Sequence, residues 1–241
     1  YDRTDLASLA SIARELAANN DPEGAARRLG KPESLNVDLA IRAPFDVRAA
    51  GIGVIPDGVD IGPRRARPGD AILVSGTMGD HGVAVMSVRE GLRFGTTLLS
   101  DTRSLHTLVA AMLDATPDIH VLRDPTRGGV AASLNEIAKA SKVGIVLSEN
   151  RLPIPAPVRA ACEMLGLDPL YVANEGLFVT IVKPNIAEAV IALLQKTDAT
   201  ANAAIIGEVG TDNPGKVLLK STIGGTRIVN FLTGEQLPRI C

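Results

Sequence analysis

The chain has 241 residues, more than a typical single domain, so one large domain or two modest ones are expected. A net charge of −2, with no block of lysine and arginine, excludes a basic nucleic-acid-binding protein. No apolar run reaches the roughly 18 residues that a membrane-spanning helix needs. Two cysteines make no disulfide framework, and the N-terminus lacks the basic-then-apolar form of a secretory signal. We therefore expect a soluble, cytoplasmic protein.

The spacing of apolar residues predicts strands and helices in alternation. Because aromatic residues make up only 2% of the chain, the core has to be built from alanine, valine, isoleucine and leucine. Residues 6–16 have the three- and four-residue spacing of a helix, and residues 37–45 alternate in part as a strand does. From residue 68 onward we predict strands at 71–74, 120–122, 144–147, 178–182, 204–209, 217–219 and 226–230, and helices at 81–90, 102–114, 130–140, 158–165 and 186–194. This alternation predicts an α/β fold, an α+β sandwich with helices packed on a mixed sheet, after a short atypical helical segment.

The stretch Asp-Pro-Thr-Arg-Gly-Gly, residues 124–129, follows a predicted strand and opens a predicted helix. Free backbone N–H groups and the helix dipole at such a junction favour an anion. Arg127 adds a fork of donors suited to phosphate or carboxylate, and Asp124 could orient Arg127 or a metal ion. The paired glycines allow the close approach of a ligand or of another segment. A turn with Asp124 as the helix N-cap explains the same residues, so both readings stay open.

Two further stretches carry polar residues beside glycines. Residues 75–82 form a second strand–loop–helix junction, in which His81 beside Asp80 is either a base or an exposed residue at a helix start. Asn174-Glu175-Gly176 precedes an apolar strand, and Glu175 there is either a turn residue or a partly buried carboxylate placed as a general base. We expect three other candidates to be structural: Cys162 in the core, and His106 and His120 at the surface or with satisfied hydrogen bonds.

The last residue, Cys241, carries a thiol beside its own α-carboxylate and close to Arg239. The arginine favours the thiolate and the α-carboxylate disfavours it, so no direction follows for the pKa of this thiol. A terminal cysteine is either part of a frayed end or a nucleophile on a tether that visits one site and then another. The residues alone leave both readings open. We expect no prenylation, because its signal needs the cysteine four residues from the end.

Taken together, these motifs resemble the HypE family of hydrogenase-maturation proteins, which belongs to the PurM or AIR synthase-like superfamily. The Asp-Pro-Thr-Arg-Gly-Gly stretch is shared across the superfamily, whereas the ending Pro-Arg-Ile-Cys, residues 238–241, is specific to this branch. The resemblance runs from about residue 51 to the end, with further matches at 51–56, 68–70, 75–82 and 172–176. It implies an atypical N-terminal segment with a remnant of the family's N-terminal domain over 1–66, an AIR synthase-like C-terminal domain over 67–232, and a mobile tail over 233–241.

The resemblance implies an ATP-dependent carbamoyl dehydratase that acts in the maturation of nickel–iron hydrogenase. A HypF-type carbamoyltransferase would load a carbamoyl group onto Cys241. Dehydration to a thiocyanate would then supply the cyanide ligand of the iron held by the HypC–HypD scaffold complex. Glu175 would act as the base, and the active-site loop would contain Asp124, Arg127 and Asn174. The implied cofactors are ATP and Mg²⁺, and the implied assembly is a homodimer.

The family also has an N-terminal ATP-binding domain with glycine- and aspartate-containing motifs. We find none of these motifs in this chain, and residues 1–46 show no resemblance to the family, so we expect that domain to be missing or replaced. Nucleotide-binding residues and metal ligands therefore stay unassigned. Two other functions stay open: a carrier module that accepts carbamoyl but cannot dehydrate it, and another PurM-like ATP-dependent enzyme, such as a selenophosphate synthetase-like or thiamine-phosphate kinase-like one. The Pro-Arg-Ile-Cys ending counts against the latter.

Overall fold

The computed structural model describes residue 55, residues 58–91 and residues 94–231. The chain divides into two compact units, Tyr1–Val59 and Asp60–Cys241, and every helix and strand named below belongs to the second. None of the described helices is long and apolar enough to cross a membrane. The predictions that lie outside the described residues concern the helix at 6–16, the strand at 37–45 and the carrier Cys241.

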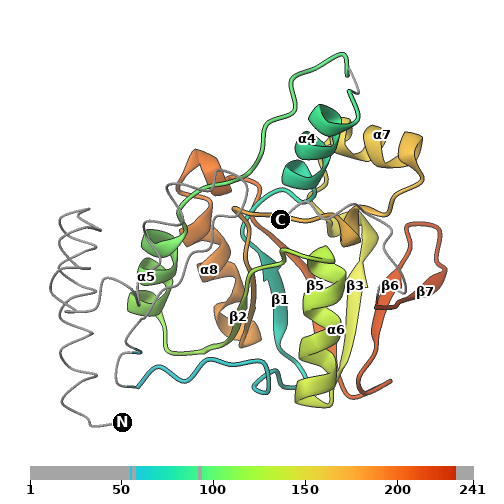
Figure 1. The fold of residues 1–241 in the computed structure, drawn as a ribbon. Coiled ribbons are helices and arrows are strands. Elements are labelled where there is room, and N and C mark those ends of the chain that lie inside the picture. Colours follow the sequence, from blue (N-terminus) through green and yellow to red (C-terminus); the bar gives the residue numbers. More distant parts are fainter. Residues whose placement is uncertain (1–54, 56–57, 92–93, 232–241) are drawn as a thin grey trace, which may run out of the picture. The chain divides into compact units, whose positions relative to one another are not determined.

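Short apolar strands build the central sheet. They are β1 (Ala71–Val74), β2 (Ile119–Arg123), β3 (Gly144–Ser148), β4 (Val179–Val182), β5 (Ala204–Gly210), β6 (Val217–Lys220) and β7 (Thr226–Val229). Among the described residues they form one sheet in the order β2-β4-β1-β5-β3-β6-β7 (Figure 1). Neighbouring strands run antiparallel except β3 and β6, which are parallel. The α/β fold with a mixed sheet, predicted from the sequence, is confirmed.

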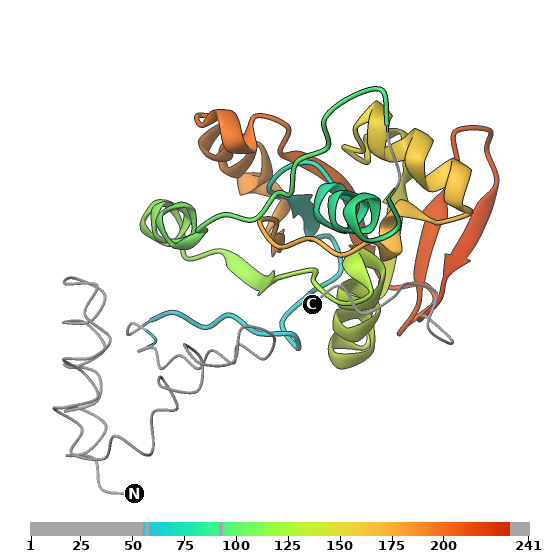
Figure 2. The ribbon, with the colours of Figure 1, turned by 45° about the horizontal axis from the view of Figure 1, so that its top comes forward.

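Helices cover both faces of this sheet. They are α4 (Asp80–Arg89), α5 (His106–Ala115), α6 (Gly129–Ser141), α7 (Ala156–Leu165) and α8 (Ala187–Leu194). Ile72 and Val74 of β1 belong to a core cluster with α6, whereas Ala71 and Leu73 belong to a second cluster with α5 and α8. All four side chains are buried, which is the period-two pattern of a strand covered on both faces. Figure 2 shows α6 and α8 on opposite sides of β1.

The helix predicted at 102–114 begins later, at His106. The residues before it have other partners: Ser100 bonds to a histidine of α4, and Asp101 and Arg103 bond to the loop that precedes β4. These long-range hydrogen bonds hold the segment in an irregular conformation. The periodic spacing of apolar residues cannot reveal such bonds, which explains the difference. Apart from this helix start, the predicted elements from residue 68 onward agree with the structure within two residues at each end.

The start of α6 corrects one reading of the Asp-Pro-Thr-Arg-Gly-Gly stretch. The helix begins at Gly129, and its N-cap is Gly128 in the left-handed conformation, with φ of 73°. No side chain caps this helix. The reading in which Asp124 is the N-cap is therefore wrong, because the loop continues from Asp124 to Gly128 before the helix starts at Gly129.

The topology gathers three loops at one end of the sheet. β1 and β2 both run antiparallel to β4, so the C-terminal ends of β1 and β2 lie at the same end as the N-terminal end of β4. The loops that meet there are residues 75–79 after β1, 124–128 after β2 and 172–178 before β4. These three loops contain the three internal motifs found in the sequence.

Candidate active site

Asn174 connects the three loops through one buried side chain. Its Oδ1 accepts a hydrogen bond from the N–H of Gly79 at 2.7 Å. Its Nδ2 donates to the carbonyl oxygens of Pro125 and Val172, at 3.2 Å and 3.0 Å. The side chain is completely buried, and a buried amide needs partners for both its donor and its acceptor groups. Asn174, predicted as an active-site-loop residue, thus lies where all three loops meet.

Two glycines, one in α4 and one in α6, bring these helices close to residues 170–173. A Cβ on Gly129 would lie 2.5 Å from the carbonyl oxygen of Leu170, and a Cβ on Gly82 would lie 2.4 Å from a methyl carbon of Val172. Gly129 also has φ of 60°, a conformation that disfavours residues with a side chain. The sequence predicted that the glycine pair permits the close approach of a ligand or of another segment. In the structure, the second glycine of the pair permits the approach of the chain's own backbone.

Asp80 and His81, at the start of α4, have separate partners. Oγ1 of Thr77 donates to the Asp80 carboxylate at 2.5 Å, whereas Nδ1 of His81 lies 2.9 Å from Oγ of Ser100. Burial raises the pKa of the Asp80 carboxyl. The hydrogen bond from Thr77 opposes this shift, and the charge of Asp101 adds to it. These contacts favour the structural reading of His81 over a base assisted by Asp80.

Glu175 follows Asn174 directly and is half-buried. Its backbone N–H donates to Oδ1 of Asp101 at 3.0 Å, so its main chain is held from a separate loop. A general base has to reach a substrate proton while its position is fixed. Glu175 therefore has a half-buried side chain on a fixed backbone, next to the buried junction at Asn174.

Asp101 and Arg103 bond to the loop of Asn174 and Glu175, and the sequence analysis did not single them out. Nε of Arg103 donates to the carbonyl oxygen of Gly176 at 2.7 Å, and its Nη1 donates to the carbonyl oxygen of Ala199. Asp101 accepts the N–H of Glu175, as described above. Both residues lie more than 70 positions from these partners in the sequence, in a stretch without a motif. No sequence signal could have identified them.

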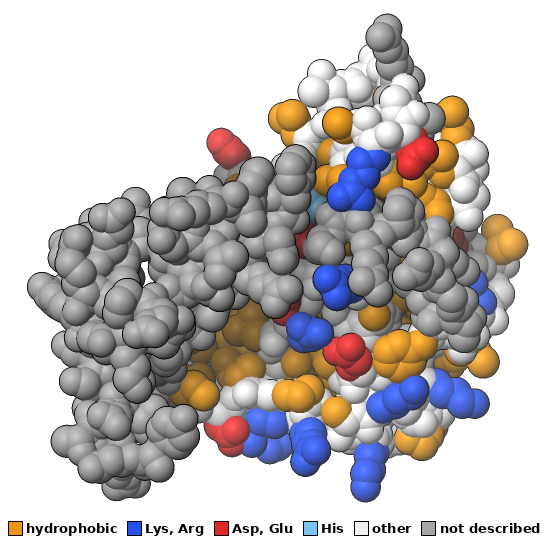
Figure 3. Space-filling view, in the orientation of Figure 1, with side chains coloured by type: hydrophobic (Ala, Val, Ile, Leu, Met, Phe, Trp, Pro, Cys, Tyr) orange, Lys and Arg blue, Asp and Glu red, His pale blue; other side chains and the backbone are white. Residues whose placement is uncertain are grey.

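Asp124 and Arg127 are exposed, in contrast to Asn174. Oδ1 of Asp124 accepts a hydrogen bond from Arg123 at 2.8 Å, and Arg123 also reaches Glu136 of α6 at 3.2 Å. Figure 3 shows basic and acidic side chains side by side on the face that α6 covers. Such exposed pairs contribute little to stability. Among the described residues, no group of three or more His, Cys, Asp and Glu side chains could hold a metal ion.

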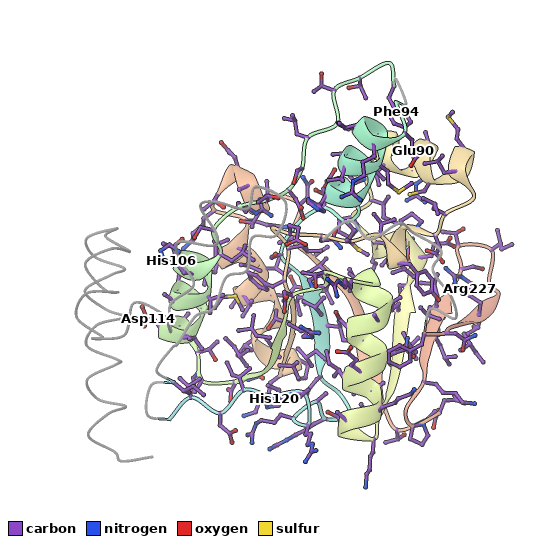
Figure 4. The ribbon with its side chains drawn as sticks, in the orientation of Figure 1. Glu90, Phe94, His106, Asp114, His120 and Arg227 are labelled. Carbon is purple, nitrogen blue, oxygen red and sulfur yellow. The ribbon has the colours of Figure 1, made fainter. Side chains whose placement is uncertain are left out.

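The remaining candidates are structural, as the sequence predicted. Cys162 is buried in α7, and burial raises the pKa of its thiol to about 11, with smaller contributions from nearby carboxylates. His120, on β2, is buried and its Nδ1 lies 2.7 Å from Oδ2 of Asp70. His106 is exposed at the start of α5 and pairs with Ser104. Figure 4 labels both histidines.

The model of the family "AIR synthase related protein, C-terminal domain" matches residues 67–220. Carbamoyl dehydratase HypE of Azotobacter vinelandii is 47% identical over 240 residues, which cover 98% of this chain and 69% of the relative. Carbamoyl dehydratase HypE of Bradyrhizobium diazoefficiens is 53% identical over 196 residues, which cover 81% of this chain and 57% of the relative.

Two solved structures are similar to the described fold. A crystal structure of the hydrogenase maturation protein HypE in complex with ATP has a TM-score of 0.73 and 45% identity, covering 78% of this chain and 57% of that chain. A crystal structure of a HypE–HypF complex has a TM-score of 0.71 and 43% identity, covering 75% of this chain and 58% of that chain. The matched part of this chain covers less than two thirds of the length of each of these two HypE chains.

The A. vinelandii alignment extends the likeness beyond its expected start near residue 51. Because it takes in 98% of this chain, it reaches well into residues 1–46, which were expected to show no resemblance to the family. That expectation is wrong for this relative. The extent of the family match and the identity to both relatives establish one conclusion: the chain belongs to the HypE family of AIR synthase-related proteins.

Proposed function

We propose that this chain acts in nickel–iron hydrogenase maturation as an ATP-dependent carbamoyl dehydratase, with Cys241 as the carrier of the carbamoyl group. The observation that carries the proposal is the junction at Asn174, which sets Glu175 beside the loops that hold the other two motifs. The identity to two relatives named carbamoyl dehydratase HypE supports the same activity. The role of Cys241 rests on the resemblance of the ending at 238–241 to this family.

The proposed reaction formally removes one water from an S-carboxamide. The amide oxygen attacks the γ-phosphorus of ATP, ADP leaves, and the nitrogen releases its first proton to solvent water. Glu175 then takes the remaining N–H proton, the C–O bond breaks with loss of phosphate, and a C≡N group remains on sulfur. Phosphorylation is needed because phosphate is a far better leaving group than hydroxide. A base whose carboxylate is fixed within reach of the nitrogen accelerates the second proton loss.

ATP is the co-substrate in this proposal, supported by the HypE crystal structure in complex with ATP. Arg127, exposed in the loop before α6, is our candidate for contact with the phosphate groups, because a guanidinium matches phosphate oxygens with two parallel donors. The described residues offer no set of three metal ligands. Mg²⁺ is therefore assigned to no described residue, and we propose that it arrives bound to ATP.

The proposed partners follow the order of the reaction. A HypF-type carbamoyltransferase loads Cys241, and the crystal structure of a HypE–HypF complex supports this pairing. The HypC–HypD scaffold complex then receives the cyano group, and the chain acts as a homodimer. We place these steps in the cytoplasm, where thiols stay reduced.

The test uses the full chain with the carbamoyltransferase, carbamoyl phosphate and ATP, followed by the mass of the C-terminal peptide. Without ATP we expect a carbamoyl adduct, and with ATP an adduct lighter by one water. Cys241→Ala should show no adduct. Cys162→Ala is the matched control for the other cysteine and should load like the wild type, because Cys162 is buried in the core.

Two results would count against the proposal in different ways. A carbamoyl adduct that persists in the presence of ATP would show a carrier module rather than a dehydratase. The absence of any adduct on Cys241, with an active carbamoyltransferase, would contradict both the carrier and the enzyme.

A further inference from the structure

Residues 100–103 form a short strap between α4 and α5, which we call the 100–103 strap. Figure 4 labels Phe94 before the strap and His106 after it. The strap is neither helix nor strand, yet two of its side chains, Asp101 and Arg103, are half-buried. Neither takes part in the reaction proposed above. Their hydrogen bonds instead converge on the turn that contains Glu175.

Asp101 holds the turn on the N-terminal side of the Glu175 side chain. Its Oδ1 accepts the N–H of Glu175 at 3.0 Å. The backbone of the strap also lies against the next residue, since a Cβ on Gly176 would lie 1.6 Å from the carbonyl oxygen of Asp101. Only glycine fits at this position, so the strap and the turn are in direct backbone contact.

Arg103 holds the same turn on its C-terminal side. Its Nε donates to the carbonyl oxygen of Gly176 at 2.7 Å, and its Nη1 donates to the carbonyl oxygen of Ala199. Its Nη2 would lie 3.0 Å from a Cβ on Gly76, which belongs to the loop after β1. One guanidinium therefore ties the turn to the segment that contains Ala199 and lies close to the loop after β1.

The strap keeps this conformation despite an electrostatic cost. Oδ2 of Asp101 is buried and has no hydrogen-bond partner among the described residues, which is unfavourable for a carboxylate oxygen. The charge of Asp101 also contributes to the raised pKa of Asp80, so the two carboxylates repel each other. Solvation of Asp101 therefore does not explain the position of the strap. The hydrogen bonds that Asp101 and Arg103 make to the turn do explain it.

We propose that Asp101 and Arg103 are positioning residues for Glu175: they hold the backbone on both sides of it and so fix where its carboxylate points. This inference rests on the proposed function, because it takes Glu175 as the base. A misplacement of a catalytic group by about 1 Å costs up to about 100-fold in rate. Neither strap side chain has to touch the substrate for its loss to slow the reaction.

The experiment compares Asp101→Ala with Asp101→Asn in the full chain. An asparagine keeps an acceptor oxygen for the Glu175 N–H, whereas an alanine removes it. Asp114→Ala, at the exposed end of α5, is the control, and Figure 4 labels this residue. Two quantities are measured: hydrogen exchange of the Glu175 amide, and single-turnover dehydration of chain that the carbamoyltransferase has already loaded.

Asp101→Ala should raise the exchange rate of the Glu175 amide about tenfold, the effect of one lost hydrogen bond. It should slow dehydration by roughly 10- to 100-fold while loading of Cys241 is unchanged. In Asp101→Asn, the exchange rate of the Glu175 amide and the dehydration rate should both lie close to those of the wild type. Asp114→Ala should change neither rate.

The proposal is overturned if Asp101→Ala leaves amide exchange and dehydration unchanged. It is also overturned if Asp101→Asn is as slow as Asp101→Ala, because the charge and not the hydrogen bond would then matter. Unchanged exchange in β1 shows that each variant is folded. If the wild-type chain loads carbamoyl but never dehydrates it, the proposed function fails. The exchange rate of the Glu175 amide in Asp101→Ala then still tests whether Asp101 holds the turn: a faster rate supports this contact, and an unchanged rate overturns it.

Discussion

The junction at Asn174 and the loop that carries Asp124 and Arg127 look alike in sequence, because both place polar residues beside glycine at the boundary of a strand. In the folded chain they differ. Asn174 is completely buried and hydrogen-bonded to three loops, whereas Asp124 and Arg127 are exposed, and Asp124 pairs with Arg123 on the surface. The difference separates two roles. A buried amide holds loops together, whereas Glu175, the next residue along the chain, is half-buried and Arg127 is exposed to solvent.

The largest expected effect is at the glycine that brings α6 against the junction. Gly129→Ala should cost at least about 3 kcal/mol of unfolding free energy, because a clash with backbone oxygens adds to the strain of a positive φ. Gly166→Ala is the matched control: its φ is 67° and a Cβ there would meet nothing within 4 Å, so about 1–2 kcal/mol is expected. Urea unfolding measures both. Equal losses at the two positions would contradict the close approach of α6 to the junction.

The next largest effect is at the junction itself. Asn174→Ala should lower the unfolding free energy by about 2–4 kcal/mol, because the N–H of Gly79 and the carbonyl oxygen of Val172 lose a buried partner. The carbonyl oxygen of Pro125 keeps its hydrogen bond from the backbone N–H of residue 174. Asn150→Ala, at an exposed position, should change it by less than about 0.5 kcal/mol. Thermal or urea unfolding of both variants makes the comparison. Similar small losses would mean that Asn174 does not hold the loops together.

Particular residues show how far the sequence could predict this site. The apolar spacing located the strands, because local patterns record local structure. Asn174 and Glu175 became candidates through the resemblance of their motif to the family, since the residues alone left Glu175 as either a turn residue or a base. Asp101 and Arg103 were not recognisable, since their partners lie 74 and 73 residues away and nothing local marks them. Asp124 was misread as a possible N-cap, because the helix starts only at Gly129, with Gly128 in the left-handed conformation as its N-cap.

A substitution at Arg127 tests the role of the exposed loop that carries Asp124 and Arg127. If its guanidinium contacts phosphate, Arg127→Ala should weaken ATP binding at least about tenfold, the usual effect of losing a charged hydrogen bond. Arg159→Ala, on the exposed face of α7, removes the same charge away from the site and should leave binding unchanged. Calorimetric titration with ATP measures both. Equal affinities for the two variants would remove Arg127 from the proposed nucleotide contacts.

The smallest effect concerns Asp80, beside the junction. Burial raises its pKa above the usual 3.8, so the folded chain binds this proton more tightly than the unfolded chain does. Its contribution to stability is therefore present below pH 3.8 and is lost as the pH rises through the folded-state pKa. The wild type loses this contribution as the pH rises, whereas Asp80→Asn has no carboxyl group to titrate. The stability of the variant relative to the wild type should therefore improve from acidic to neutral pH. Urea unfolding at both pH values would show this trend, and a difference independent of pH would contradict it.

The central claim is that Glu175 removes the last amide proton, and one single-turnover measurement tests it most directly. Wild-type chain and Glu175→Gln are first loaded with carbamoyl on Cys241, then mixed with ATP, and the C-terminal peptide is weighed over time. The account predicts equal loading, a wild-type product lighter by one water, and a carbamoyl adduct that persists on Glu175→Gln, because glutamine cannot accept the proton. Dehydration of Glu175→Gln at the wild-type rate would contradict the account.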